Sequence, residues 1–77
     1  MVFEKIRKII VEQFGLSEEA VTEETGFVTD IGADSLDVVE LAMSVEDTFG
    51  IGEISEEDIR SIQTVGDLVN YVNSKLD

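Results

Sequence analysis

Apolar side chains recur every three or four residues in four stretches of the chain, the spacing that places them on one face of an α-helix. In the first stretch Phe3, Ile6, Ile10 and Phe14 follow this spacing, and Gly15 is a residue type that commonly ends a helix. The pattern predicts a helix ending before Gly15, a second over Leu36–Phe49, a short third running to about Ile62, and a fourth whose buried face is Val65, Leu68, Val69, Val72 and Leu76. Ser55 to Asp58 resembles a capping box for the third helix, and Thr64 is the expected N-cap of the fourth.

Residues 16–34 show no sustained periodicity and form a connection longer than most. Its apolar residues Val21, Phe27 and Ile31 are expected to pack it onto the rest of the chain. No segment alternates apolar and polar residues as a strand would. We therefore predict one all-α domain over residues 1–77, a four-helix bundle with a short third helix and a long loop between helices one and two.

The predicted helix over residues 36–49 carries two apolar faces on a helical wheel. An ordinary core face consists of Val38, Leu41, Ala42, Val45 and Phe49. The second face consists of Leu36, Val39 and Met43, rimmed by the acids Asp37, Glu40, Glu46 and Asp47. An apolar centre with a charged rim is typical of a docking surface for another protein. The alternative is that Leu36 and Val39 lie beneath the long loop.

Charge and residue usage exclude several classes of function. The 18 acids and 5 bases give a net charge of −13, and fourteen acids but no base lie between Gln13 and Ile59. Such a surface repels nucleic acid and anionic membranes and favours partners with basic patches. Without Cys or His, disulfides, the usual zinc sites and Ser-His-Asp catalysis are excluded. So small a core also disfavours an enzyme.

No apolar run reaches the length of a membrane span, and the first residues contain no signal-peptide core. We expect a soluble monomer in a bacterial cytoplasm, with a mature organelle protein as the alternative.

The segment Gly32-Ala33-Asp34-Ser35-Leu36-Asp37 leads into the second predicted helix. Either Asp34 or Ser35 suits its N-cap, and capping is the simplest interpretation of Ser35. A helix N-terminus also favours a negative group, so a phosphodiester on the Ser35 hydroxyl would be well placed. Asp34 and Asp37 oppose this by repelling a phosphate.

This segment, followed by Val39-Glu40-Leu41, resembles the phosphopantetheine attachment motif of the fatty-acid acyl carrier proteins, and the likeness covers essentially the whole chain. The resemblance implies that a holo-synthase transfers 4′-phosphopantetheine from coenzyme A to Ser35, flanked by Asp34 and Leu36. It implies a carrier rather than an enzyme, delivering acyl thioesters to the enzymes of fatty acid synthesis through basic docking patches. It also implies an acyl-chain cavity, here Leu41, Val45, Ile54, Ile59, Ile62 and Leu68.

Other interpretations remain open. A carrier of polyketide or aminoacyl units shares the fold and the serine, whereas an acidic decoy of nucleic acid needs only the charge. An EF-hand is excluded because a loop starting at Asp30 has Ser35 and Leu41 where Gly and Glu are required. Weak divalent-cation sites near Asp30, Asp34 and Asp37 are possible, with no specific metal site. The chain also has Ile54-Ser55 where the family commonly has Ile-Pro, and one additional residue near Gly50–Gly52.

Overall fold

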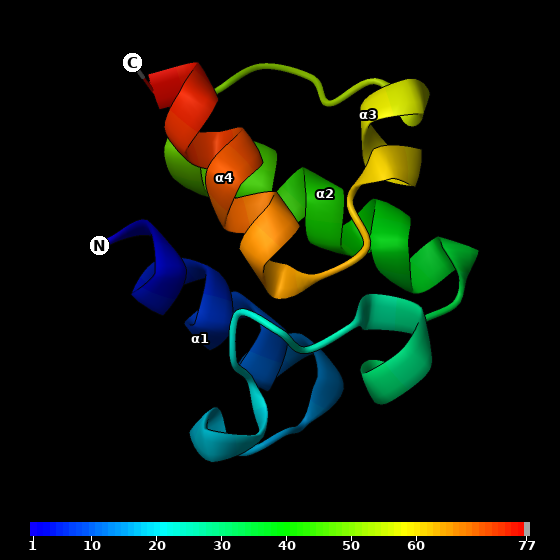
Figure 1. The fold of residues 1–77 in the computed structure, drawn as a ribbon. Coiled ribbons are helices and arrows are strands. Elements are labelled where there is room, and N and C mark those ends of the chain that lie inside the picture. Colours follow the sequence, from blue (N-terminus) through cyan, green and yellow to red (C-terminus); the bar gives the residue numbers. More distant parts are fainter. Residues whose placement is uncertain (77) are drawn as a thin grey trace.

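The computed structural model describes residues 1–76, and over this range the helices are joined by loops with no β-strand (Figure 1). The α-helices are α1 (Val2–Phe14), α2 (Ser35–Phe49), α3 (Glu56–Ser61) and α4 (Val65–Leu76). Within the described residues the only β-type pairing is an isolated antiparallel bridge between Gly26 and Thr64. The predicted all-α bundle with a short third helix is confirmed.

The structure adds detail to the sequence-based prediction and contradicts it at one residue, Leu76. The connection over residues 16–34 contains a 3₁₀ turn, η1 (Glu18–Ala20), and a π-helical turn, η2 (Phe27–Ile31). Single turns of this kind are too short to produce a repeating apolar pattern. Helix α3 ends at Ser61, just before Ile62. Leu76, expected on the buried face of α4, is 50% exposed and is the last residue of that helix.

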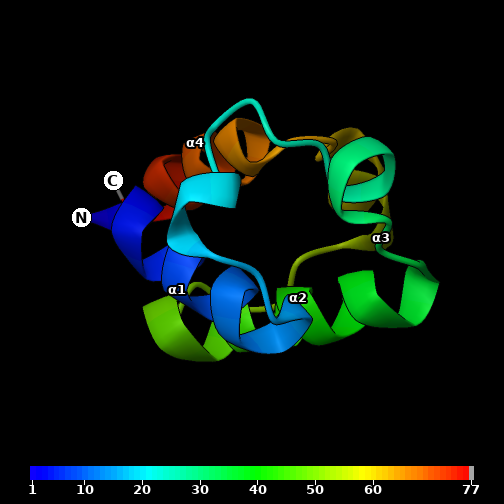
Figure 2. The same ribbon diagram turned by 90° about the horizontal axis from the view of Figure 1, so that it is seen from below.

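The core lies where α1 packs against both α2 and α4 (Figure 2). Ile6 and Ile10 of α1 are completely buried, as are Val45 of α2 and Val72 of α4. Val21 and Phe27 of the long connection join the same core. The N-terminus and the end of α4 lie close together at one end of the molecule in Figures 1 and 2. The opposite end is therefore left for the start of α2.

Backbone hydrogen bonds hold the long connection against the start of α4. Phe27 N donates to Gln63 O at 3.0 Å, and Val65 N donates to Thr25 O at 2.9 Å. Gly66 N donates to Glu23 O at 2.8 Å, and a Cβ added at Gly66 would lie 2.9 Å from that same oxygen. This close approach explains a glycine inside a helix. The connection thereby places η2 beside the N-terminal end of α2.

Candidate functional site

Asp34, rather than Ser35, is the N-cap of α2. Its Oδ1 accepts a hydrogen bond from Asp37 N at 2.9 Å, and Asp37 Oδ2 accepts one from Asp34 N at 3.1 Å. This reciprocal capping box settles the choice that the sequence left open. Both acids of the motif therefore define where the helix begins.

Ser35 is consequently the first residue of α2, and its side chain is not needed for capping. The residue is exposed, and its hydroxyl makes no hydrogen bond to any other residue in the range 1–76. The first N–H groups of a helix have no intrahelical acceptor. Asp34 satisfies those of Asp37 and Val38, which leaves the N–H groups of Ser35 and Leu36 for a ligand. An exposed hydroxyl thus lies at a site that favours a phosphate.

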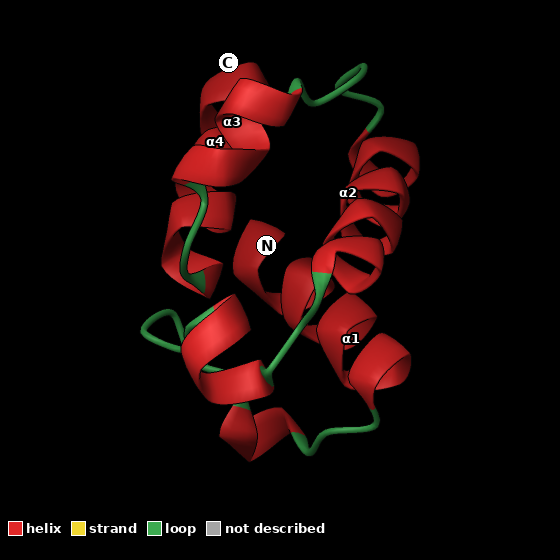
Figure 3. Cartoon of the chain, turned by 90° about the vertical axis from the view of Figure 1, so that its right-hand side faces the viewer, coloured by secondary structure: helices red, strands yellow, loops and turns green. Residues whose placement is uncertain are grey.

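Ser35 also lines a pocket of about 740 Å³ between η2, the first half of α2, α3 and the start of α4. In Figure 3, α2 forms one side of the molecule and α3 with α4 forms the other. Most of the pocket lining is apolar and comprises Phe27, Val28, Ala33, Val38, Val39, Leu41, Ala42, Ile54, Ile59, Ile62 and Leu68. Pockets of this size and character hold small apolar ligands.

Five of the six residues expected to form an acyl-chain cavity line this pocket, namely Leu41, Ile54, Ile59, Ile62 and Leu68. The sixth, Val45, does not line it. It lies one turn further along α2, where its side chain is completely buried in the core. The family resemblance implied both Leu41 and Val45, which share one face of α2, and only the fold separates them.

The pocket has few charged residues, and they come from different elements. Asp34 and Glu56 contribute negative charge, and Arg60 of α3 is the one basic residue in the lining. The sequence pattern did not indicate that Glu56 or Arg60 lies in one pocket with Ser35. The carboxylate of the nearby Asp30 is already engaged, since its Oδ2 accepts a hydrogen bond from Gly26 N at 2.7 Å. Across residues 1–76 no group of three or more potential ligands is arranged to hold a metal ion.

The second apolar face of α2 is exposed. Leu36, Val39 and Met43 are 75%, 48% and 58% exposed, so the long connection does not cover them. Val28 of η2 is 70% exposed and also lines the pocket. No local pattern groups Val28 with α2, because only the fold places η2 beside that helix. We refer to Leu36, Val39 and Met43 as the exposed apolar stripe.

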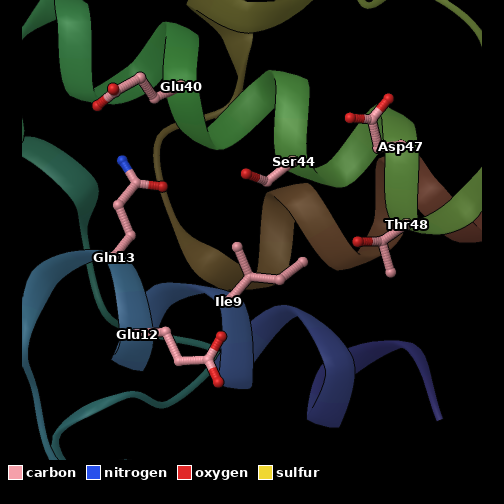
Figure 4. Close-up of a pocket in the computed structure, with 7 residues that line it drawn as sticks. All are labelled: Ile9, Glu12, Gln13, Glu40, Ser44, Asp47 and Thr48. Carbon is pink, nitrogen blue, oxygen red and sulfur yellow. The ribbon is translucent and has the colours of Figure 1, made fainter.

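The acids near the exposed apolar stripe differ in their surroundings. Figure 4 shows Glu40 and Asp47, together with Ser44 and Thr48, on the side of α2 that faces α1 across a polar groove. Glu12 of α1 adds a further acid to that groove.

The remaining two acids, Asp37 and Glu46, are half-buried and bonded. The Asp37 carboxylate accepts the capping bond from Asp34 N, and Gln13 Nε2 donates to the backbone carbonyl oxygen of Asp37 at 2.9 Å, which fastens α1 to the start of α2. Glu46 Oε2 accepts a hydrogen bond from Ile54 N at 2.8 Å, which fastens the connection before α3. Glu40 and Asp47 are therefore the acids of this group that are open to a partner.

Comparison with known proteins agrees with this geometry. A family model described as "Phosphopantetheine attachment site" matches residues 4–72. The structure is also similar to that of an acyl carrier protein of high thermal stability from Enterococcus faecalis. The two are 40% identical, the match covers 96% of this chain and 92% of that one, and the TM-score is 0.81. This chain therefore belongs to the phosphopantetheine attachment family. Within that family it is of the acyl carrier type, a carrier and not an enzyme.

Membership implies a covalently attached phosphopantetheine group, and the residues present fit it. The exposed Ser35 hydroxyl is available for attachment, and the adjoining N–H groups suit a phosphate. The apolar pocket beside Ser35 suits the cargo of such a group. Within the described residues, no helix is long and apolar enough to cross a membrane.

Proposed function

We propose that Ser35 carries a 4′-phosphopantetheine arm and that the chain delivers acyl groups, bound as thioesters, to the enzymes of fatty acid synthesis. The observation that supports this most strongly is the position of the Ser35 hydroxyl. It is exposed at the first position of α2, beside the pocket and at one end of the exposed apolar stripe. Ser35 is thus accessible to a modifying enzyme, and it adjoins both the pocket and the exposed apolar stripe.

Attachment requires a donor and a transferase, for which we propose coenzyme A and a holo-synthase. Ser35 Oγ would form a bond to the phosphorus that bears pantetheine and would release its proton to the transferase. The bond between that phosphorus and the bridging oxygen breaks, and 3′,5′-adenosine bisphosphate leaves. The N–H groups of Ser35 and Leu36 lie where they favour the new phosphodiester. Once bound, the arm supplies the thiol that this Cys-free chain lacks and that forms the thioester.

The lining of the pocket favours an alkyl cargo. Leu41, Ile54 and Leu68 are buried, and the half-buried Ile59 and Ile62 complete an apolar wall. Burying a methylene group in such surroundings contributes roughly 0.8 kcal/mol. Aminoacyl or polyketide units carry polar groups that would need partners in the pocket. This difference, rather than the attachment motif, is the reason to prefer a fatty acyl carrier over those two alternatives.

The docking surface that we propose combines the exposed apolar stripe with Glu40 and Asp47. Leu36, Val39 and Met43 supply area that a partner desolvates, and the acids orient a basic patch on that partner. A bacterial cytoplasm, where synthase and transferase enzymes would meet the carrier, belongs to the same proposal.

Intact mass tests the attachment. The unmodified chain is incubated with coenzyme A and a phosphopantetheinyl transferase, alongside Ser35→Ala and the matched control Ser44→Ala from the same helix. We expect the wild type and Ser44→Ala to gain one phosphopantetheine and Ser35→Ala to gain none. No gain in the wild type, or an equal gain in Ser35→Ala, would contradict the proposal.

Acyl transfer tests the docking surface. Glu40→Lys reverses an exposed charge and Met43→Ala removes exposed apolar area, and neither residue is part of the core. Both should slow transfer to several partner enzymes while leaving the melting curve nearly unchanged. The matched control Glu53→Lys reverses an exposed charge away from α2 and should have a smaller effect. Normal transfer by both variants would argue against this surface.

A further inference from the structure

Positive charge is scarce in this chain, and one basic residue occupies a notable position. Arg60 is the only base between Lys8 and Lys75. It lines the same pocket as Ser35, the residue to which the arm is proposed to be attached. The other charged residues of that lining, Asp34 and Glu56, are acids. The pocket therefore has a single cationic hydrogen-bond donor.

The contact that Arg60 makes at present is weak and replaceable. Its guanidinium lies 3.8 Å from Glu56 Oε1, an i,i+4 pair on the surface of α3. The two side chains are 79% and 89% exposed, so water screens their attraction. Arg60 also lies in the last turn of α3, where a cation suits the helix dipole. The ion pair with Glu56 and the helix dipole account for a basic residue at position 60. They leave most of the five N–H donors of its guanidinium without an acceptor in α3.

Modification of Ser35 would create acceptors that need such donors. A phosphodiester at Ser35 adds a negative charge beside Asp34 and Asp37, which already form the capping box. Beyond the phosphate, a phosphopantetheine arm has a hydroxyl group and two amide carbonyls. A guanidinium binds phosphate and carbonyl oxygens with several donors at once. Arg60 is the one pocket residue that offers both this geometry and the opposite charge.

We infer that Arg60 donates hydrogen bonds to oxygen acceptors of the arm on Ser35, exchanging Glu56 for them, and so holds the arm along the pocket. This inference rests on the proposed function. Arg60 thereby acts as a positioning residue for the carried group. Because the contact is exposed and ionic, added salt should weaken it.

Side-chain NMR tests this contact directly, since the chain has only two arginines, Arg7 and Arg60. Arg7 lies on α1, with its guanidinium 3.9 Å from Glu18, and serves as an internal reference. The Nε–H signals of both are recorded in the unmodified chain and in the mass-verified product with its arm attached. We expect the Arg60 signal to shift on attachment, with nuclear Overhauser contacts to arm protons, while the Arg7 signal stays in place.

Matched variants separate a contact with the arm from a merely structural role. Arg60→Gln should release the arm, so that the methyl signals of the arm move toward those of free phosphopantetheine. In Arg60→Lys, which keeps the charge, the methyl signals of the arm should lie between those of the wild type and those of Arg60→Gln. Glu56→Gln removes the competing partner and should enlarge the Arg60 shift. An unshifted Arg60 signal in the modified chain, with arm signals unaffected by Arg60→Gln, would overturn this inference alone. Failure of the wild type to gain the arm would overturn the proposed function, and the inference with it.

Discussion

The hydrogen bond between Glu46 and Ile54 holds one side of the pocket in place, so its removal should loosen that side. Glu46 Oε2 accepts from Ile54 N at 2.8 Å, joining the last part of α2 to the connection before α3. That connection turns through Gly50 and Gly52, whose positive φ angles of 62° and 82° other residues rarely adopt. Ile54 is itself buried and lines the pocket. Replacing Glu46 with Ala should therefore loosen this wall.

The magnitude follows from the kind of bond that is lost. A hydrogen bond to a charged group contributes about 1.5–3 kcal/mol, and the half-buried position of Glu46 favours the lower end. Removing an acid near the C-terminus of a helix returns about 0.3–1 kcal/mol. The net destabilisation in Glu46→Ala should be about 0.5–1.5 kcal/mol. Glu46→Gln keeps an acceptor without the charge, so it should lose roughly half of that amount.

Hydrogen exchange at the Ile54 amide, with urea unfolding in parallel, measures this effect. Exchange should be roughly 2- to 13-fold faster in Glu46→Ala, the factor that corresponds to about 0.5–1.5 kcal/mol. The control Asp47→Ala removes the neighbouring acid, which is exposed and bonded to nothing in the described residues, so it should show only the dipole gain of about 0.3–1 kcal/mol. Unchanged exchange at Ile54, with the two variants equally stable, would refute the reasoning.

Three further predictions concern packing, titration and charge. Gly66→Ala, which in an ordinary helix would stabilise, should destabilise by about 1–3 kcal/mol in urea unfolding, since the new Cβ meets Glu23 O at 2.9 Å; a gain in stability would contradict this. Burial raises the pKa of the Tyr71 phenol above its ordinary value of 10.0, and the nearby carboxylates of Asp58 and Glu46 raise it further. The unfolded chain then releases this proton at lower pH than the native chain, so unfolding free energy should fall as pH rises above 10.0. Ultraviolet titration reports on this single tyrosine without interference from tryptophan, and a midpoint at or below the ordinary value would be contrary evidence. Because the net charge is −13, Mg²⁺ should raise the melting temperature relative to NaCl of equal ionic strength, and identical melting curves would oppose this.

The sequence predicted the helices well because their signals are local. The spacing of Ile6 and Ile10, and the glycines that end α1 and α2, need no tertiary information. The exposure of Leu36 and Met43 also follows from the helical wheel, once the opposite face of α2 is assigned to the core.

Features that depend on tertiary contacts were not predictable in the same way. The turn η2 forms where Gly26 pairs with Thr64, a residue far along the chain, so no local pattern announces it. Val45 was assigned to the cavity from the family resemblance, and only the packing of the helices shows that it lies in the core. Glu46 looked like an ordinary surface acid, since its bond to Ile54 depends on how the intervening glycines turn the chain. Arg60 gained interest only when the fold placed it in one pocket with Ser35.

The position of the added mass tests the central claim most directly. After modification with coenzyme A and a transferase, the wild-type chain is digested and the modified peptide is fragmented to locate phosphopantetheine. The exposed hydroxyl at the start of α2 predicts attachment at Ser35 and at none of the other serines, among them Ser44 and Ser55. Phosphopantetheine on any other residue, or a chain that gains none, would contradict the account.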